Sequence, residues 1–264
     1  MTVYTDLVKY RELFGNLFRR DLQAKYKGSF LGVAWTLANP LLLMAIYLLI
    51  FSVLWKAVSI DHYALFLLSG LAPWIFFSSS IQNASRSLLD NASLIRKTRF
   101  PRQLVPLSIV ATNLVSLAVM LVVLLVVNFV FLPRVRATEW LAIPLVALLV
   151  CMIGGLALIV ASLDVLYRDV EHLIAALLLP WFFLTPILYT YGTLGAAQQH
   201  QTLVDVLHWL NFMAPPIIAI RDPLFYGTMP AWGDTVYLAV AAVVSLALGA
   251  WVFSRLDDRL AVEL

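Results

Sequence analysis

Residues 19–54 read RRDLQAKYKGSFLGVAWTLANPLLLMAIYLLIFSVL, and this stretch decides the class of the protein. A basic, polar segment runs without a linker into an apolar run, inside which Pro40 is the strongest helix breaker. A hydrocarbon core about 30 Å thick needs about 20 apolar residues, so the run predicts a membrane-spanning helix. Cations beside a first span hold its amino end in the cytoplasm, so the stretch also predicts an orientation. The four cations that precede the run are Arg19, Arg20, Lys25 and Lys27.

The composition of the whole chain indicates the same class. The chain has 264 residues, of which 62% are hydrophobic and only 12% charged, whereas a soluble domain carries about 25% charged residues. The net charge of +3 comes from loop lysines and arginines, so it reports membrane topology rather than nucleic-acid binding. The single cysteine, Cys151, excludes an intrachain disulfide. The first thirty residues lack the apolar core of a signal peptide, so we expect the mature protein to keep them.

Hydropathy and length predict an all-α membrane protein with six spans. Both termini are expected in the cytoplasm, because fourteen of the eighteen lysines and arginines then lie on the cytoplasmic side. The predicted spans cover residues 31–55, 63–81, 104–132, 140–163, 173–191 and 235–253.

Two further segments are predicted to lie at or partly within the membrane. Residues 203–220 are apolar but interrupted by polar residues and prolines, which favours a broken helix that dips into the outer leaflet. A seventh span is the alternative, but it would place the neighbouring loop and the tail arginines on inconsistent sides. The arm at 4–20 has an apolar and a charged face, which is typical of a helix in the cytoplasmic interface plane. That helix either contacts a cytoplasmic partner or anchors the chain.

The chain carries no pattern that indicates catalysis. It has no G-x-x-x-x-G-K-[ST] loop for nucleotide phosphates, no H-E-x-x-H pattern and no paired cysteines. The centres of the predicted spans contain no Asp, Glu, Lys or Arg, although ion-coupled transporters usually keep such residues there. If the protein moves a cargo, we therefore expect the energy to come from another chain.

The loop after the second predicted span is a candidate docking site. Residues 85–106 read SRSLLDNASLIRKTRFPRQLVP, and their middle predicts a short amphipathic helix over Leu88–Arg99, with Asp90 or Asn91 as its cap. Pro101 ends it, because proline disfavours helix at the residue before it. An ordinary positive-inside loop is the alternative, but the apolar residues within so short a polar loop favour docking.

Several motifs resemble one known family. RDLQAKYKGSFLGVAWTLANPLL (20–42), NASLIRKTRFPRQLVPL (91–107), DVLYRD (164–169) and TPILY (185–189) occur in this order. Together they resemble the membrane permease subunit of bacterial polysaccharide ABC exporters, the O-antigen, capsule and teichoic acid exporters of the type-2 ABC membrane family. The similarity extends loosely over nearly the whole chain.

The resemblance implies one exporter transmembrane domain over 1–264, in a homodimer with two copies of a separate ATPase subunit. ATP and Mg would bind the partner subunit, and this chain would bind no cofactor. It implies an interface arm (1–30), a coupling loop (86–102), an external re-entrant region (192–234) and a bacterial inner membrane location. The residues implied to couple to the ATPase are Leu88, Leu89, Asn91, Leu94, Ile95, Arg96, Lys97 and Arg99.

The family passes a glycan on a polyprenyl lipid between two protomers, through a channel implied to be lined by the first and fifth spans. Aromatic rings stack on the apolar faces of sugars, so they would let a repetitive polymer slide. The alternative is the aromatic belt of any membrane protein, which explains mid-span rings less well. The implied channel-lining residues are Trp35, Tyr47, Phe51, Trp181, Phe182, Phe183 and Tyr189.

Two rival functions remain. A permease of the same superfamily could export a drug, lipid or other small molecule, and it would not need an aromatic-lined channel. An enzyme acting on polyprenyl-linked sugars would need acidic residues at one membrane face, and only Asp164, Asp169 and Glu171 are dense enough.

Three local patterns also predict structure. Gly154-Gly155 predicts close helix packing, and Pro180 and Pro186 predict a kink in the fifth span. Arg221-Asp222 predicts a salt bridge or a cargo contact.

Overall fold

The computed structural model describes residues 6, 9–27, 35–54, 60–97, 100–131, 137–193 and 200–263. Every regular element in these ranges is helical, as the composition predicts. The longer helices are α2 (Arg11–Tyr26), α3 (Trp35–Tyr47), α4 (Tyr63–Asp90), α6 (Leu104–Phe131), α7 (Ala142–Leu166), α8 (Val170–Leu184), α10 (Gln201–Leu210) and α12 (Trp232–Glu263). The shorter ones are η2 (Leu48–Leu54), α5 (Ala92–Lys97), η3 (Glu139–Leu141), η4 (Tyr191–Thr193), α11 (Ala214–Arg221) and η5 (Asp222–Tyr226).

Four of the helical segments are long and apolar enough to cross a membrane, so the chain is a multi-pass membrane protein. They correspond to the second, third, fourth and sixth predicted spans. They run over Tyr63–Asp90, Leu104–Val130, Glu139–Leu166 and Trp232–Asp257.

The first and fifth predicted spans are less regular. Helix α3 passes directly into the π-helical η2, so the first predicted span is helical from Trp35 to Leu54. Residues 31–34 and 55 of that prediction lie outside the described residues. Helix α8 ends at Leu184 rather than at residue 191. It ends there because Thr185 precedes a proline and takes an extended conformation (φ −89°, ψ 136°). The predicted kink at Pro186 is therefore the end of the helix.

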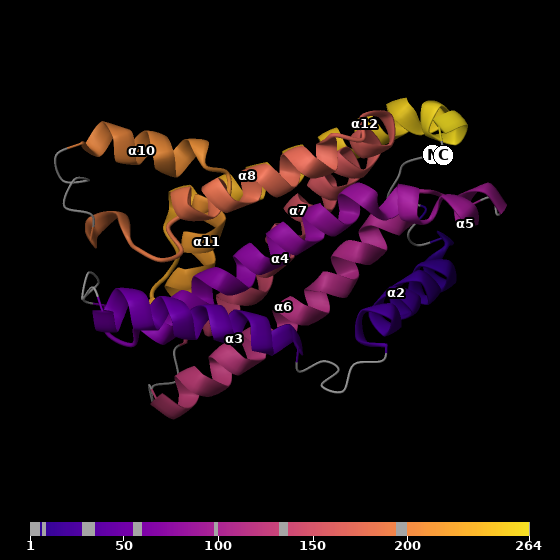
Figure 1. Cartoon of the computed structure of the whole chain (residues 1–264). Coiled ribbons are helices and arrows are strands. Elements are labelled where there is room, and N and C mark those ends of the chain that lie inside the picture. Colours follow the sequence, from indigo (N-terminus) through magenta and orange to yellow (C-terminus); the bar gives the residue numbers. More distant parts are fainter. Residues whose placement is uncertain are drawn as a thin grey trace.

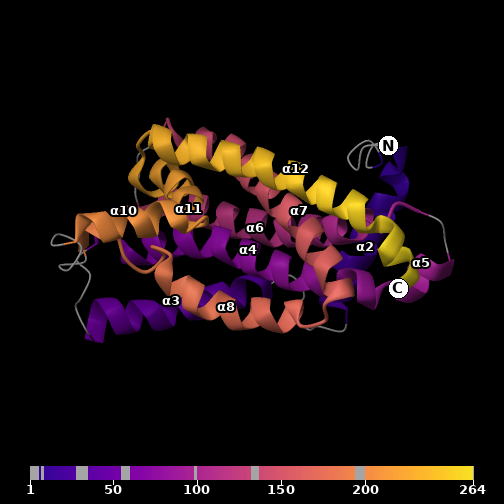
Figure 2. The same ribbon diagram turned by 90° about the horizontal axis from the view of Figure 1, so that it is seen from above.

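Helices α10 and α11 form the broken apolar segment predicted from the sequence. Their axes differ by 92° across a break of three residues, 211–213. These two helices lie at one end of the bundle, whereas α2, α5 and the carboxyl end of α12 lie at the other end (Figures 1 and 2). The two regions expected outside and in the cytoplasm are thus at opposite ends of the molecule.

Helix α4 is the centre of the bundle. Of its most apolar 18-residue window, 78% is buried inside this chain, against 28% for that of α12. Burial is divided between two apolar clusters. The larger occupies the middle and the α10–α11 end. The smaller, which we call the α5-end core, joins six helices through Leu17, Leu88, Ile95, Leu104, Leu158 and Phe253, among others.

Helices α7 and α12 approach each other through glycines. A Cβ placed on Gly155 would overlap the backbone carbonyl of Ser245, and one on Gly249 would overlap the carbonyl of Gly155. A Cβ on Gly154 would meet only the Leu107 side chain, at an ordinary 3.6 Å. The predicted close packing is therefore present, and within the Gly154-Gly155 pair it depends on Gly155.

Candidate functional site

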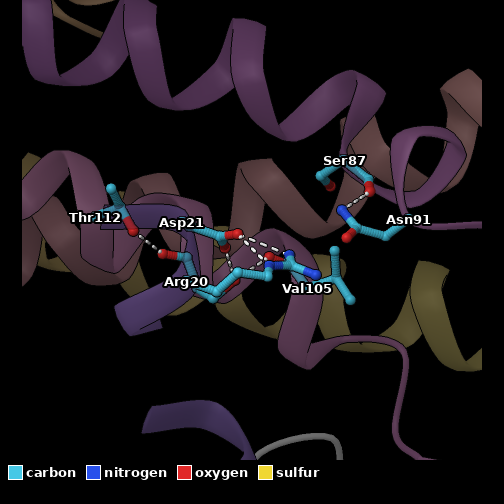
Figure 3. A network of polar contacts seen from close by, with 7 residues as sticks. Arg20, Asp21, Ser87, Asn91, Val105 and Thr112 are labelled. Atoms are coloured by element: carbon cyan, nitrogen blue, oxygen red, sulfur yellow. Dashed lines mark hydrogen bonds and ion pairs between the residues drawn. The ribbon is translucent and has the colours of Figure 1, made fainter. Parts of the chain in front are cut away.

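The predicted docking helix is divided between two elements. Leu88 and Leu89 belong to the last turn of α4, and α5 begins only at Ala92. Asn91 lies at the junction, where its side-chain amide donates to the Ser87 carbonyl at 2.8 Å (Figure 3). The Asn91 side chain therefore closes the end of α4, instead of capping the helix that follows as the sequence suggested.

The apolar residues of this segment face the protein interior. Leu88 and Ile95 are buried in the α5-end core, and Leu89 and Leu94 pack against it. The side chains of Ser93, Arg96 and Lys97 are exposed, so they form the outer face of α5. Arg99, the remaining predicted coupling residue, lies outside the described residues. The exposed surface of α5 is thus polar and basic, while Leu94 and Ile95 attach the helix to the α5-end core.

Polar contacts fasten α2 to α6. Ser108 Oγ lies 2.8 Å from both Asp21 Oδ2 and the Val105 carbonyl, and Asp21 also pairs with Arg20 at 2.7 Å (Figure 3). Farther along α2, the Lys25 ammonium donates to the side-chain oxygens of Asn113 and Ser116, at 3.1 and 2.8 Å.

Lys25 as a whole is exposed, but its ammonium is partly desolvated, which lowers the pKa of Lys25. Our reading of the sequence did not single out the polar side of α6. A signal was available there, because Ser108, Thr112 and Ser116 recur at intervals of four residues in a predominantly apolar helix.

Ion pairs link the α5 end of the bundle to α8. Arg86, in the last turns of α4, pairs with Glu171 in the first turn of α8 at 3.2 Å. Asp164 is buried, and its carboxylate accepts the Glu171 backbone N–H at 2.9 Å, where the start of a helix leaves N–H groups unpaired. Asp164 and Glu171, considered above for an enzyme, therefore have structural partners. At the same end of the bundle, Arg102, just before α6, pairs with Asp257 of α12 at 2.6 Å.

Several predicted channel residues come together between α3 and α8. The rings of Tyr47 and Phe182 stack with centroids 5.7 Å apart and planes at 25°. The ring centroid of Phe51 lies 6.3 Å from that of Tyr47. The ring of Trp74, in α4, meets that of Phe182 edge to face, with centroids 5.7 Å apart. The first and fifth predicted spans are therefore neighbours, as the channel hypothesis requires.

The remaining predicted channel residues have different environments. Trp35 and Phe183 are 57% and 52% exposed, so both rings are available to a second copy, a lipid or a cargo. Tyr189 folds back, with its hydroxyl 3.1 and 3.2 Å from the carbonyls of Phe183 and Leu184 at the end of α8.

Trp181 points into the protein. Its Nε1–H donates to Asn211 Oδ1 at 2.8 Å, and its ring lies 4.3 Å from that of Phe212. Asn211 also donates to the Thr185 hydroxyl at 2.9 Å, so it ties the end of α8 to the break between α10 and α11. The sequence marked Asn211 only as a polar interruption, and its structural role was missed.

In the described ranges, no group of three or more His, Cys, Asp or Glu side chains is placed to hold a metal ion. The described features are instead an exposed basic face on α5, an ion pair that joins the adjoining end of α4 to α8, and an aromatic seam between α3 and α8.

Comparison with known proteins gives a consistent result. The family model described as ABC-2 type transporter matches residues 12–225. The O-antigen export system permease protein RfbA of Myxococcus xanthus is 32% identical over 258 residues, which cover 97% of this chain and 96% of the relative. An RfbA permease of Klebsiella pneumoniae is 32% identical over 250 residues, covering 92% and 91%, respectively. A second from that species is 32% identical over 248 residues, with the same coverage.

Proposed function

The chain belongs to the ABC-2 type transporter family, and on this premise we propose that it is the permease subunit of an ATP-driven exporter of lipid-linked polysaccharide. The observation that carries the proposal is that three relatives, aligned over 92–97% of this chain, are all O-antigen export permeases. A cargo of the same chemical class, an O-antigen-like glycan on a polyprenyl lipid, is therefore proposed here.

In this proposal the chain has six spans in the bacterial inner membrane, with both termini in the cytoplasm. Helix α3 with η2 is the first span, and α8 with the residues after it is the fifth. The α10–α11 hairpin is re-entrant in the outer leaflet, because its bend and its polar residues suit a segment shielded by protein. The lysines and arginines support this orientation, since α5 and the end of α12 lie at the end where cations gather.

The partner in the proposal is a cytoplasmic ATPase, present in two copies, which binds ATP and Mg. It would contact the outer face of α5 (Ser93, Arg96 and Lys97) and the adjoining Arg99. When ATP draws the two ATPase subunits together, α5 moves with them because it is bound to them. The α5-end core then follows α5, because Leu88 and Ile95 are buried in that core. The Arg86–Glu171 pair then carries the movement to α8.

The cargo path in the proposal runs between two copies of this chain, along α3 and α8. Exposed Trp35 and Phe183 would contact sugar rings directly, while the Tyr47–Phe182 stack sets the spacing of the two helices. Trp181 would hold α8 against the hairpin through its hydrogen bond to Asn211. This surface provides repeated weak contacts and no deep pocket, which suits a long polymer.

The rival from the same family is an exporter of a drug, lipid or other small molecule. It predicts that the exposed aromatic residues are dispensable, because a small cargo needs a closed site rather than an extended aromatic seam. The contacts of Asp164 and Glu171 at the start of α8 argue against the enzyme alternative, because they give both acidic side chains a structural role.

Deletion of the gene tests the proposal. A strain without this chain should accumulate lipid-linked glycan at the cytoplasmic face of the inner membrane and lose that glycan from its surface, and a plasmid copy should restore surface glycan. A Leu94→Asp copy should insert normally yet fail to restore export, because the new charge would separate α5 from the α5-end core. Unchanged surface glycan in the deletion strain would contradict the cargo class, and full restoration by Leu94→Asp would contradict the coupling assignment.

A further inference from the structure

Arg221, at the carboxyl end of α11, is a buried cation whose partners are neutral. The residue is 2% exposed. Its Nη1 donates to the Pro186 carbonyl at 2.7 Å, its Nη2 to the Ile187 carbonyl at 3.3 Å, and its Cζ lies 4.0 Å from the ring centroid of Phe66. In the part of the chain that the structure describes, no carboxylate lies within 4 Å of this guanidinium. The salt bridge with Asp222 that the sequence suggested is therefore replaced by contacts with the backbone after α8.

The position of these carbonyls explains why they need donors. Helix α8 ends at Leu184, so the carbonyls of Pro186 and Ile187 lie beyond its end and outside its hydrogen-bond ladder. Pro186 cannot continue the helix, so these carbonyls depend on side-chain donors or water. Away from water such a carbonyl is costly to leave unpaired. A guanidinium supplies several donors in one plane, which suits two neighbouring carbonyls better than the single ammonium of lysine.

Two other side chains hold the same four residues, Thr185–Leu188. The Tyr63 hydroxyl of α4 donates to the Leu188 carbonyl at 2.7 Å, and Asn211 donates to the Thr185 hydroxyl at 2.9 Å. All four residues are buried. The segment after α8 is therefore fixed from α4, from the α10–α11 break and from α11, and of these only Arg221 brings a charge.

Helix α4 leaves space for this charge. A Cβ placed on Gly70 would overlap Nη2 of Arg221 and would lie 3.3 Å from the Ile187 side chain. Glycine at position 70 therefore leaves room for the guanidinium. Replacing Gly70 by alanine would disturb the Arg221 contact from the α4 side.

We propose that Arg221 is a positioning residue that locks the α10–α11 hairpin to the end of α8, so that hairpin and helix move as one body during transport. The proposal rests on the proposed function only in taking α8 as a moving wall of the cargo path. Without the lock, movement of α8 at its cytoplasmic end would no longer carry the outer hairpin with it. ATP would then be hydrolysed without productive export.

Hydrogen–deuterium exchange tests the lock without any cargo. The purified chain in lipid nanodiscs is compared with Arg221→Met, Arg221→Lys, Gly70→Ala and the exposed control Arg255→Met. Arg221→Met should speed exchange of the amides of residues 187–190 about tenfold or more, the factor expected for loss of a buried charge-assisted hydrogen bond. Arg221→Lys should give a smaller increase in exchange, because lysine retains the charge but lacks the planar set of donors of the guanidinium. Gly70→Ala should speed exchange at the same residues.

The increase should be confined to 187–190 and the α10–α11 hairpin, with α7 and α12 unchanged. Exchange at 187–190 that matches the Arg255→Met control in both Arg221→Met and Gly70→Ala would overturn the proposal. So would an equal increase over all helices, because that would indicate a general loss of fold. If Arg221→Met does not fold, Arg221→Lys and Gly70→Ala still decide the question.

A second measurement separates the lock from the proposed function. In cells that carry the ATPase partner, Arg221→Met should leave ATP hydrolysis by the purified complex unchanged and reduce surface glycan about tenfold, whereas Arg255→Met should alter neither. Export of glycan by Arg221→Met at the wild-type level would overturn the positioning role. Absence of export by the unmodified chain would instead contradict the proposed function and leave the exchange result as the test of the lock.

Discussion

Replacing Gly155 by alanine should destabilise the protein, whereas the same change at the adjacent Gly154 should not. The two glycines are neighbours in α7, but only Gly155 faces the backbone of α12. Its new methyl group would overlap the Ser245 carbonyl and come within 2.5 Å of the Leu246 backbone nitrogen. Backbone cannot swing aside as a side chain can, so the two helices must separate along their contact. The methyl group on Gly154 would make an ordinary contact with the Leu107 side chain.

The size of the effect follows from two opposing terms. Alanine favours helix over glycine by about 1 kcal/mol, and this gain is the same at both positions. Overpacking a close contact costs about 1–3 kcal/mol, and here the separation of two long helices places the cost in the upper part of that range. We therefore expect Gly155→Ala to be destabilising by about 1–2 kcal/mol and Gly154→Ala to be neutral or slightly stabilising.

The assay is thermal unfolding of the three proteins in the same detergent, followed by tryptophan fluorescence. For a chain of this size 1 kcal/mol corresponds to about 2–4 °C in the midpoint, so Gly155→Ala should unfold several degrees below Gly154→Ala. Gly249→Ala, which approaches the same contact from α12, should resemble Gly155→Ala. Equal midpoints for Gly154→Ala and Gly155→Ala would refute the reasoning that α7 and α12 are in backbone contact.

Three further predictions concern the link to α8 and the aromatic seam. Arg86→Glu should lower export several-fold while shifting the unfolding midpoint little, because an exposed ion pair contributes at most about 1 kcal/mol; adding Glu171→Arg should restore surface glycan, and failure of that rescue would exclude the pair as a link. Tyr47→Ala together with Phe183→Ala should reduce surface glycan with normal insertion, and full tolerance would favour a small-molecule cargo. Trp181→Phe should lower the free energy of unfolding by about 1 kcal/mol, because it removes the hydrogen bond from Trp181 to Asn211. The loss should appear as a lower unfolding midpoint, and an unchanged midpoint would contradict a stabilising role of that hydrogen bond.

Much of the fold could be predicted from hydropathy, because a long apolar helix in a membrane has few alternatives. This explains why four spans and the broken α10–α11 segment were predicted correctly. The end of α8 was predicted too late because Pro186 lies within an apolar run, and hydropathy is insensitive to the backbone restriction that proline places on Thr185.

The candidate site could be predicted only in part. Periodicity showed that the segment around α5 has an apolar face, but it does not tell whether a partner or the same chain covers that face. Leu88 and Ile95 proved to be covered by the chain's own helices. The role of Arg221 could not be predicted, because its partners are backbone carbonyls of the segment after α8, 34 and 35 residues earlier in the sequence.

The central claim is that this chain is driven by a separate ATPase that binds the outer face of α5. The most direct measurement is purification from the native membrane in mild detergent, comparing the wild-type chain with a double variant, Arg96→Glu with Lys97→Glu. Both side chains lie on the outer face of α5 and the variant leaves the α5-end core unchanged, so it should insert and fold as the wild type does. The account predicts an ATPase that co-purifies in equal copies with the wild type and is lost from the variant. A wild-type chain that purifies without an ATPase, or a variant that retains it fully, would contradict the account.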